Sequence, residues 1–541
     1  MKNIFVGSLL FVATATSGAV AQDPVPSDGP SSVELSEVAR TPNAETTSSL
    51  VTLRSRIGKD LPATGGLAPE IRDFRLDYKT GALIVDTDIL SETIQKSFEK
   101  TSGGSAIVPF ALPNSMLLQF SPRVGKEALD IVKNNKLDVT NVFPNLSAIQ
   151  ISADLTRFFK AQPTDNNNND TILRGLIAAS EYYKSLDPNI IAATPDTLLS
   201  GQVDAEKVTA SDVMSYPPGT QQLIDWGMSD IQADQLWEMP GASDGTIVGV
   251  MDAGFARHED LVFLRPAERL VVSDHGNHVA GILCARHDNN KGMVGVLPNC
   301  FIRPQAADAL NIAADTGNVS QFIISFGQVL HAFDRLLEEE SNIKAFNVSL
   351  GYNWVPNFGI DPDGASSGVW RDYVRMQGPF ALSALSRAQR TGQVIFSAAG
   401  NDSSQGREIS AEFASPMNWA AVQANSQHLP GEGYGIIVEA HDKNGNRAEF
   451  SNSNGSISCP GVDIRSSVAM DENQKPSDRS YGLMSGTSMA SPYCAGGFAL
   501  LSLVLPTRNP KQILKCMLDS TERSSAGTPM LKLKDAYNRC H

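Results

Sequence analysis

The sequence predicts a three-layer α/β domain with a largely parallel sheet, preceded by a small α+β region. Apolar segments that suit strands buried on both faces alternate along the chain with helical segments, as in sheets covered by helices on each side. The strands are expected near Ile247, Phe346, Val394 and Ile437, and the helices near Val279, Phe333, Leu385 and Ala495. Because each helix returns the chain to the end of the sheet at which the previous strand began, neighbouring strands should run parallel.

The first 21 residues have the pattern of a secretory signal peptide. Lys2 supplies the positive start, residues 4–13 form a short apolar core, and Ala-Val-Ala at 19–21 fits the cleavage rule. Such a short core cannot span a bilayer; a buried N-terminal helix is the alternative. No later stretch suits a membrane span, so we expect an exported protein that is secreted or periplasmic.

The remaining chain divides into three parts. Residues 22–105 are expected to be flexible and poorly defined, because their first forty or so residues are rich in Pro, Ser, Thr and Glu without periodicity. Residues 106–215 form an α/β region with a linker, and residues 216–541 form the main domain. Within the second part we expect strands at 116–120, 137–143 and 146–151, helices at 122–135 and 171–186, and a polar linker at 165–170.

Ser488 lies among small residues in the run Gly-Thr-Ser-Met-Ala-Ser-Pro at 486–492, directly before an apolar helix. Residues 491–505 are apolar on every face, so this helix should be buried. A serine here would lie at the positive end of the helix dipole, where free N–H groups can hold an oxyanion. The alternative for an isolated serine is a helix cap.

A base and its orienting acid can be found elsewhere in the chain. Asp252 ends the apolar strand run that begins at Thr246, where open α/β sheets place their sites. His275 begins a second helix with a Gly/Ala surface. A serine becomes a strong nucleophile when an imidazole takes its proton, and that imidazole needs an acid to fix its tautomer.

Several motifs in this order resemble the subtilase family of subtilisin-like serine peptidases, over roughly residues 220–541. They lie at residues 226–237, 250–255, 275–281, 346–351, 397–401, 459–462 and 485–496. The resemblance implies a subtilisin-like three-layer domain and a serine endopeptidase. In that reading Asp252 orients His275, which acts as general base and acid, and Ser488 is the nucleophile.

The resemblance also implies how the substrate is held. The side-chain amide of Asn401 and the backbone N–H of Ser488 would donate to the oxyanion. Two strands would flank the extended peptide and wall the pocket for the residue before the cut. Their residues are Ser349, Leu350 and Gly351 on one side and Ala398, Ala399 and Gly400 on the other.

The α/β region at 106–215 resembles the propeptide domain of subtilases. In the family such a domain helps the peptidase to fold and blocks its cleft until it is cut away. We therefore expect a self-processed zymogen whose own N-terminal region is an intramolecular inhibitor and folding aid. The maturation point is expected within residues 194–218, a polar stretch that contains prolines.

The chain departs from the family pattern at several places. Tyr493 and Cys494 replace the usual His-Val, and Asn277 replaces the usual Thr. None of these belongs to the triad, so we expect a locally repacked helix and an active enzyme. The segment between Asp252 and His275 is short, and residues 353–379 are expected to form a loop that elaborates the cleft.

No cofactor is expected to be required. His275 and His278 are spaced as zinc ligands could be, but no acidic residue lies between them and no third ligand is evident. His278 is expected to be a structural residue under the site, and His258 a loop residue. Residues 288–290, Asp-Asn-Asn, could supply oxygen ligands to calcium, although Lys291 beside them favours a solvated turn.

Composition suits an exported enzyme. The 541 residues are 41% hydrophobic and 19% charged, and the net charge of −15 argues against nucleic acid and anionic membranes as partners. The six cysteines suggest disulfides, although many pairings are possible and some could be small core residues. By position we favour the pairs Cys284–Cys300, Cys459–Cys494 and Cys516–Cys540.

Two functions from different classes fit the sequence. The first is an active, self-processing endopeptidase acting on peptides or proteins. The second is a catalytically silent peptide-binding or interaction protein that keeps the fold. A complete triad with Asn401 favours the first, because a binding protein has no chemical need for all four residues.

Overall fold

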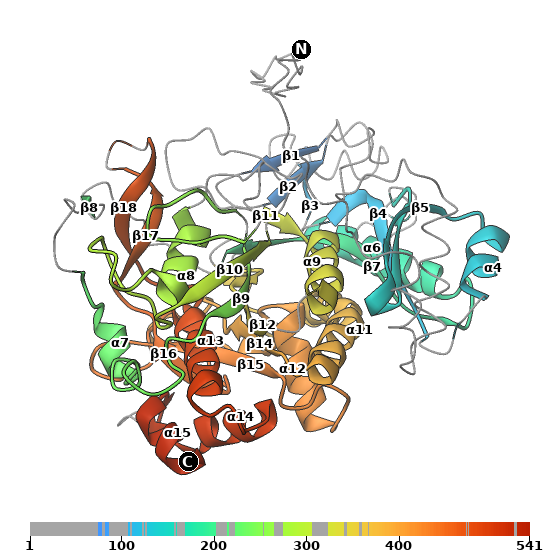
Figure 1. The fold of residues 1–541 in the computed structure, drawn as a ribbon. Helices are drawn as coiled ribbons and strands as arrows, with labels where there is room; N and C mark the ends of the chain where they lie inside the picture. The colour runs from blue at the N-terminus through green and yellow to red at the C-terminus, as the bar shows by residue number, and fades with distance from the viewer. Residues whose placement is uncertain are drawn as a thin grey trace, which may run out of the picture.

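A computed structural model of the chain describes three short strands between residues 74 and 108 and most of residues 111–541 (Figure 1). The longest gaps in the second range are residues 159–167, 202–213, 265–273 and 306–322. The expected signal peptide lies outside the described residues, as does most of 22–105. The three short strands, β1 (Phe74–Asp77), β2 (Ala82–Val85) and β3 (Ala106–Val108), form one antiparallel sheet.

The central sheet of the molecule has eight strands, and most of them are parallel. Their order is β10-β9-β12-β14-β15-β16-β20-β19, and the last pair is antiparallel. The strands are β9 (Thr246–Met251), β10 (Cys300–Gln305), β12 (Ile343–Val348), β14 (Val394–Ala398), β15 (Gly435–His441), β16 (Ile457–Pro460), β19 (Glu522–Arg523) and β20 (Pro529–Met530). All four predicted strands are thereby confirmed.

Helices cover both faces of this sheet and complete the predicted three layers (Figure 1). One face carries α8 (Asp274–Cys284) and α13 (Thr487–Val504). The other carries α9 (Phe326–Glu339), α11 (Gly368–Thr391) and α12 (Pro416–Ser426). Because successive strand residues point to opposite faces, Phe396 joins the core under α13 while its neighbour Ile395 joins the core under α11. No helix in the described ranges is long and apolar enough to cross a membrane.

The N-terminal α+β region folds as a sheet backed by helices. Its elements are β4 (Ala111–Phe120), α4 (Glu127–Asn134), β5 (Asp138–Phe143), the 3-10 turn η4 (Pro144–Leu146), β6 (Ala148–Ser152), α6 (Asn168–Lys184) and β7 (Ile190–Gly201). Helix α4 buries Ala128, Ile131 and Val132, as its amphipathic pattern predicts. Helix α6 begins inside the segment that composition marks as a linker.

Strand β7 is the main element that the sequence does not predict. It overlaps the start of the stretch expected to contain the maturation point, and its apolar pattern is interrupted by Pro195, Asp196 and Thr197. Asp196 and Thr197 are nevertheless fully buried. Strand β7 pairs with β4 along most of its length and lies between β4 and β11 in the strand order of this sheet.

The N-terminal region is docked on α9 and α11 through a continuous hydrophobic core. Residues of β4, β5 and β6 share this core with Phe333 of α9 and Phe380 of α11. Asn145 of η4 donates from its backbone N–H to Asp334 Oδ1 (2.6 Å) and from its side chain to the Asp334 carbonyl (3.0 Å). Buried apolar area and paired polar groups together explain why the two parts stay in contact.

The loop expected at residues 353–379 is only partly a loop. The second half of this stretch belongs to α11, which runs from Gly368 to Thr391 with Pro379 inside it. Gly378 and Pro379 both have low intrinsic helix propensity. In the structure, the Trp419 ring lies so close to Gly378 that any side chain there would overlap it, and packing outweighs the weak local propensity.

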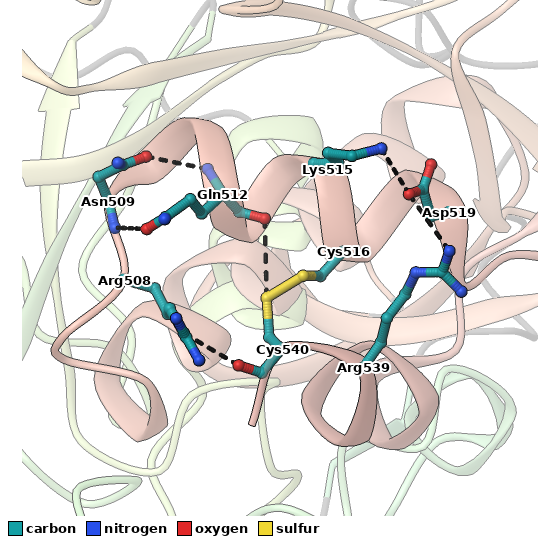
Figure 2. Close-up of a disulfide and its surroundings, with 8 residues drawn as sticks. All are labelled: Arg508, Asn509, Gln512, Lys515, Cys516, Asp519, Arg539 and Cys540. Atoms are coloured by element: carbon teal, nitrogen blue, oxygen red, sulfur yellow. Dashed lines mark hydrogen bonds and ion pairs between the residues drawn. A yellow bond between two sulfur atoms is a disulfide. The ribbon is translucent and has the colours of Figure 1, made fainter.

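All six cysteines form the disulfides favoured from their positions. Cys284 pairs with Cys300, Cys459 with Cys494, and Cys516 with Cys540. The last pair joins α14 (Pro510–Asp519) to the C-terminal α15 (Leu533–Cys540), as Figure 2 shows. Arg508 also donates to the carbonyl of Cys540 (2.9 Å), so the chain end has a second attachment.

Removing the Cys516–Cys540 bridge should destabilise the protein. The two cysteines are 24 positions apart, and the bridge restricts the unfolded chain between them. Replacing both with alanine removes this restriction and should lower the free energy of unfolding by about 3 kcal/mol. Thermal and denaturant unfolding measure this change. A double variant with an unchanged midpoint would contradict a bridge in the folded protein, and mass spectrometry of non-reduced peptides checks the pairing itself.

Candidate active site

Asp252 lies at a strand end, and His275 and Ser488 lie at the starts of two helices. Asp252 follows β9 directly, and its backbone N–H donates to the Gln305 carbonyl (3.0 Å). His275 is the second residue of α8, and Ser488 is the second residue of α13. The two helices pack against each other in one core. Asp252 and Ser488 are fully buried and His275 is 8% exposed.

The Asp252 carboxylate holds one side of the His275 ring. Nδ1 lies 2.9 Å from Oδ1 and 2.8 Å from Oδ2. A proton on Nδ1 suits this contact and leaves the lone pair on Nε2, which has no hydrogen-bond partner among the described residues. Gly276 permits this approach, because a Cβ there would lie 1.8 Å from the Gly254 carbonyl oxygen. The ring therefore presents an unoccupied basic nitrogen.

The Ser488 hydroxyl is hydrogen-bonded to Ser349. It donates to the Ser349 carbonyl (3.3 Å), and Ser349 Oγ donates to the Ser488 carbonyl (3.1 Å). Asn347 of β12 donates to Ser349 Oγ (2.9 Å) and so fixes that side chain. Ser488 thus bonds to Ser349 rather than to His275. In other enzymes, the hydrogen bond between a nucleophile and its base is often long or poorly aligned until substrate binds.

The amide of Asn401 is oriented by Thr487, a residue that the sequence analysis does not single out. Asn401 Oδ1 accepts from the Thr487 backbone N–H (3.0 Å) and hydroxyl (2.8 Å). Because a backbone N–H can only donate, the oxygen of the amide must face Thr487. The Nδ2 group then points away, and it has no partner among the described residues.

Gly400 completes this arrangement. Its N–H donates to the Thr487 hydroxyl (3.1 Å), so Thr487 bridges Gly400 and Asn401. Gly400 has φ 103°, and a Cβ would lie 2.7 Å from that of Ala414. Both the conformation and the close approach require glycine. In the sequence, the position of Thr487 directly before Ser488 is the one indication of its role.

The residues expected to flank a substrate lie on two strand ends beside Ser488. Ser349 precedes β13 (Leu350–Gly351), and Ala398 ends β14. Ala399 donates to the Val438 carbonyl of β15 (2.9 Å) and is followed by Gly400. Leu350, Ala398 and Ala399 are buried in the structure as it stands.

The end of β7 occupies the position beside β13. Ser200 and Gly201 pair antiparallel with Gly351 and Leu350. On its other edge, β7 pairs antiparallel with β11 (Ile323–Ser325). A segment of the N-terminal region is therefore added as a strand between β11 and β13, which is how extended peptides are commonly bound.

The two departures from the family pattern are accommodated by local hydrogen bonds. Asn277 Oδ1 accepts from the Ala256 N–H (2.9 Å). Tyr493 donates to Asp225 Oδ1 (2.8 Å), and its ring fills the space where Gly227 has no side chain. Burial raises the pKa of Asp225, while the bonds from Gly227 and Tyr493 oppose this shift. The expected local repacking thus reaches α7 (Trp226–Asp230).

The two other histidines near the site contact backbone carbonyls. His278 Nε2 lies 2.9 Å from the Ile464 carbonyl, and burial lowers its pKa to about 3. His258 Nε2 lies 3.0 Å from the Ser480 carbonyl, and burial lowers its pKa to about 4. Both are therefore neutral at pH 7. The described residues contain no group of three or more His, Cys, Asp or Glu placed to share a metal ion.

A cluster of oxygen atoms surrounds the side-chain nitrogen of Gln222 beside residues 288–290, which the sequence analysis names as possible calcium ligands; of these three, Asn289 belongs to the cluster. Gln222 Nε2 lies 2.6 to 3.1 Å from the carbonyls of Arg286, Lys291 and Met293 and from Asn289 Oδ1. An amide nitrogen carries two protons and cannot donate to four acceptors. Exchanging the nitrogen and oxygen of the Gln222 amide would instead place its oxygen in the cluster. Asp260 contacts Asn289 (2.7 Å) and supplies charge. Lys291 Nζ points to Glu259 (3.2 Å), so this cation does not occupy the cluster.

Comparisons with known proteins show which family this chain resembles. The model of the subtilase family matches residues 243–535. A thermostable alkaline protease of Halalkalibacterium halodurans is 28% identical over 299 residues, covering 54% of this chain and 66% of that protein. Subtilisin DY of Bacillus licheniformis is 28% identical over 306 residues, covering 54% of this chain and 89% of that protein.

A solved structure shares the fold. Fervidolysin from Fervidobacterium pennivorans, described as a keratinolytic enzyme related to subtilisin, aligns with a TM-score of 0.51 and 21% identity. The alignment covers 79% of this chain and 61% of that chain. The chain thus spans somewhat less than two thirds of fervidolysin and about two thirds of the alkaline protease.

Proposed function

Because this chain belongs to the subtilase family of serine peptidases, we propose that it is an exported serine endopeptidase. In this proposal Asp252, His275 and Ser488 form the catalytic triad. The observation that carries it is the pairing of His275 Nδ1 with the buried Asp252 carboxylate, which leaves Nε2 as a base in the core shared by α8 and α13. Export is proposed from the signal pattern of residues 1–21.

The proposed reaction follows from these positions. Ser488 Oγ attacks a peptide carbonyl while His275 Nε2 takes its proton, and Asp252 stabilises the resulting imidazolium. His275 then gives the proton to the leaving amine, and a water molecule resolves the acyl-enzyme. The oxyanion would be held by the backbone N–H of Ser488 at the start of α13 and by Nδ2 of Asn401.

We also propose that the chain is made as a zymogen. The end of strand β7 pairs with β13, one of the two strand ends that the sequence analysis expects to flank substrate, and its other edge pairs with β11. The N-terminal region is anchored on α9 and α11. A domain held in this way would exclude other peptides and would stabilise the sheet it docks on. Both roles match those expected of an intramolecular inhibitor and folding aid.

The second candidate, a silent peptide-binding protein, is favoured by one observation, the Ser488 hydroxyl that bonds to Ser349 rather than to His275. Expressing the full chain and its Ser488→Ala variant separates the two functions. An active enzyme loses its N-terminal region only when Ser488 is present. If both proteins stay full length and neither reacts with a serine-directed phosphonate after limited proteolysis, the peptidase proposal is wrong.

Replacing Asn401 with leucine should lower turnover by about a hundredfold to a thousandfold and leave KM nearly unchanged. The physical reason is that Nδ2 would stabilise charge that develops only in the transition state. Steady-state kinetics on a cleaved peptide measure both constants. A KM that rises by the same factor as turnover falls, or an unchanged turnover number, would place Asn401 outside the oxyanion site.

The stability of the docked zymogen should depend on pH through Asp196. Its carboxylate accepts from the Gly327 N–H at the start of α9 (2.7 Å) and from Gln150 (2.9 Å), and burial raises its pKa from 3.8 to about 6. A carboxyl group with a raised pKa adds stability that is fully present below its ordinary pKa. This contribution is lost as the pH rises through the raised value.

We therefore expect the uncut Ser488→Ala chain to gain stability as the pH falls from 7 towards 4. In the same background, Asp196→Asn should remove part of that gain, up to about a hundredfold in the unfolding equilibrium. Asp138→Asn, at an exposed position of β5, is the control. Thermal unfolding across this pH range is the measurement, and identical slopes for Asp196→Asn and the control would contradict the assignment.

A structural calcium ion is proposed at the oxygen cluster around Gln222. The carbonyls of Arg286, Lys291 and Met293, the side chains of Gln222 and Asn289, and the Asp260 carboxylate are the hard oxygen donors that calcium prefers. Bound calcium would stabilise the folded chain by mass action. Nothing in the proposed reaction requires the ion.

Chelation should lower the melting temperature of the Ser488→Ala chain, and added calcium should restore it. The Asn289→Ala variant should lose most of this calcium response, whereas Asn444→Ala, at an exposed turn, should keep it. Thermal unfolding with chelator and with millimolar calcium checks both. An equal response in the two variants would contradict a site at Asn289.

A further inference from the structure

The side chain of Thr197, towards the end of β7, contacts a buried polar group of the main domain. Its hydroxyl lies 3.2 Å from the hydroxyl of Tyr352, the residue directly after β13. The Tyr352 hydroxyl in turn lies 2.5 Å from Gln377 Oε1 on α11. All three residues are 1% exposed or less. The proposed reaction uses none of them, so this contact calls for another explanation.

The hydrogen bonds in this chain of side chains run in one direction. Gln377 Nε2 donates to the Tyr373 carbonyl (3.1 Å), and because a carbonyl can only accept, the amide oxygen must face Tyr352. Burial raises the pKa of Tyr352, so its hydroxyl keeps its one proton and donates it to Gln377. Thr197 must therefore donate its own proton to the Tyr352 oxygen. The main domain thus offers a hydrogen-bond acceptor to β7.

This acceptor is held in place without help from β7. The Tyr352 backbone N–H donates to the Ala414 carbonyl (2.9 Å), and its ring packs on Trp354 with the centroids 4.4 Å apart. Trp354 Nε1 donates to the Phe413 carbonyl (2.7 Å), which fixes that ring as well. All these residues belong to the main domain. The Tyr352 hydroxyl should therefore keep its position when the N-terminal region is removed.

The pairing of β7 determines which residue of a bound peptide reaches this acceptor. Ser200 pairs with Gly351 of β13, and Thr197 comes three positions earlier on the same strand. A shift by one residue would turn Thr197 to the opposite face of β7. An extended peptide that adds as a strand in this register therefore presents one particular side chain to Tyr352. It belongs to the third residue before the one that pairs with Gly351.

We propose that the Tyr352 hydroxyl forms a substrate subsite that selects serine or threonine at that position. The inference rests on the proposed peptidase function and adds a preference for the peptides that the cleft binds. A hydroxyl side chain of the substrate would donate to Tyr352 as Thr197 does in the uncut chain. Valine has nearly the shape of threonine but no proton to donate, so it would desolvate the Tyr352 oxygen without replacing the bond.

Inhibition by short peptides tests this subsite in the processed protein. The full-length chain is allowed to process, its N-terminal fragment is separated, and cleavage of a reference peptide is inhibited with a peptide of residues 194–201. Valine in place of Thr197 in this peptide should weaken inhibition by about tenfold, whereas serine should change it little. Valine in place of Thr194 is the matched control, because Thr194 pairs with Leu117 of β4, which the separated protein lacks.

The Tyr352→Phe variant shows whether this hydroxyl makes the distinction. It keeps the ring and removes the acceptor oxygen, so the threonine and valine peptides should then inhibit almost equally. Equal inhibition by the two peptides in the unaltered protein would overturn the subsite, and so would an undiminished difference in the variant. In both cases the protein still cleaves the reference peptide, so the peptidase function stands. A chain that neither processes nor cleaves would overturn both.

The same hydrogen bond can be measured in the uncut Ser488→Ala chain, where catalysis has no part. Thr197→Val and Tyr352→Phe are made singly and together, and denaturant unfolding gives the loss of stability for each. Because the two side chains share one bond, the loss in the double variant should be smaller than the sum of the single losses. Thr197→Ser, which keeps the donor, should be coupled to Tyr352 as threonine is. Losses that simply add would overturn the proposal.

Discussion

Two hydrogen bonds between Ser349 and Ser488 join the parts of this molecule on which its proposed chemistry depends. They tie the start of α13, a buried helix in the central core, to the residue that leads into β13. Because β13 is also the strand against which β7 pairs, the same contact sets the position of a bound peptide relative to the nucleophile. Asn347 holds Ser349 from the adjacent strand β12, so the contact is braced by the sheet itself.

Some polar groups around this contact can act only as a hydrogen-bond donor or only as an acceptor, and they thereby fix the orientation of their neighbours. The backbone N–H of Thr487 can only donate, so it determines which end of the Asn401 amide faces outward. The Asp252 carboxylate can only accept when it is ionised, so it places the ring proton of His275 on Nδ1. In both cases a buried group with one possible role orients a neighbour with two. Before substrate binds, Nδ2 of Asn401 and Nε2 of His275 are thus already oriented as the proposed reaction requires.

The sequence predicts the central sheet well, because a buried parallel strand such as β9 is an almost continuous apolar run. The cysteine pairs favoured by position also form. The candidate site residues lie in several ordered motifs that resemble those of subtilases. The sequence does not predict β7, because Asp196 and Thr197 interrupt the apolar pattern and become acceptable only through partners at the start of α9 and directly after β13. It predicts a helix near Leu385 but misses the N-terminal half of α11, where contact between Gly378 and Trp419 outweighs a local proline. The role of Gln222 depends on a loop more than sixty positions away, and no local pattern signals it. The features that escape prediction thus depend on contacts between residues far apart in the sequence.

The central claim is that β7 occupies the cleft beside a reactive Ser488 until the N-terminal region is cut and removed. The most direct measurement is the rate at which a serine-directed phosphonate labels Ser488 in freshly processed protein, before and after separation of the N-terminal fragment. The account predicts slow labelling while the fragment is bound and fast labelling once it is gone. Equal rates in the two states would contradict occupation of the cleft, and labelling at a residue other than Ser488 would contradict the site itself.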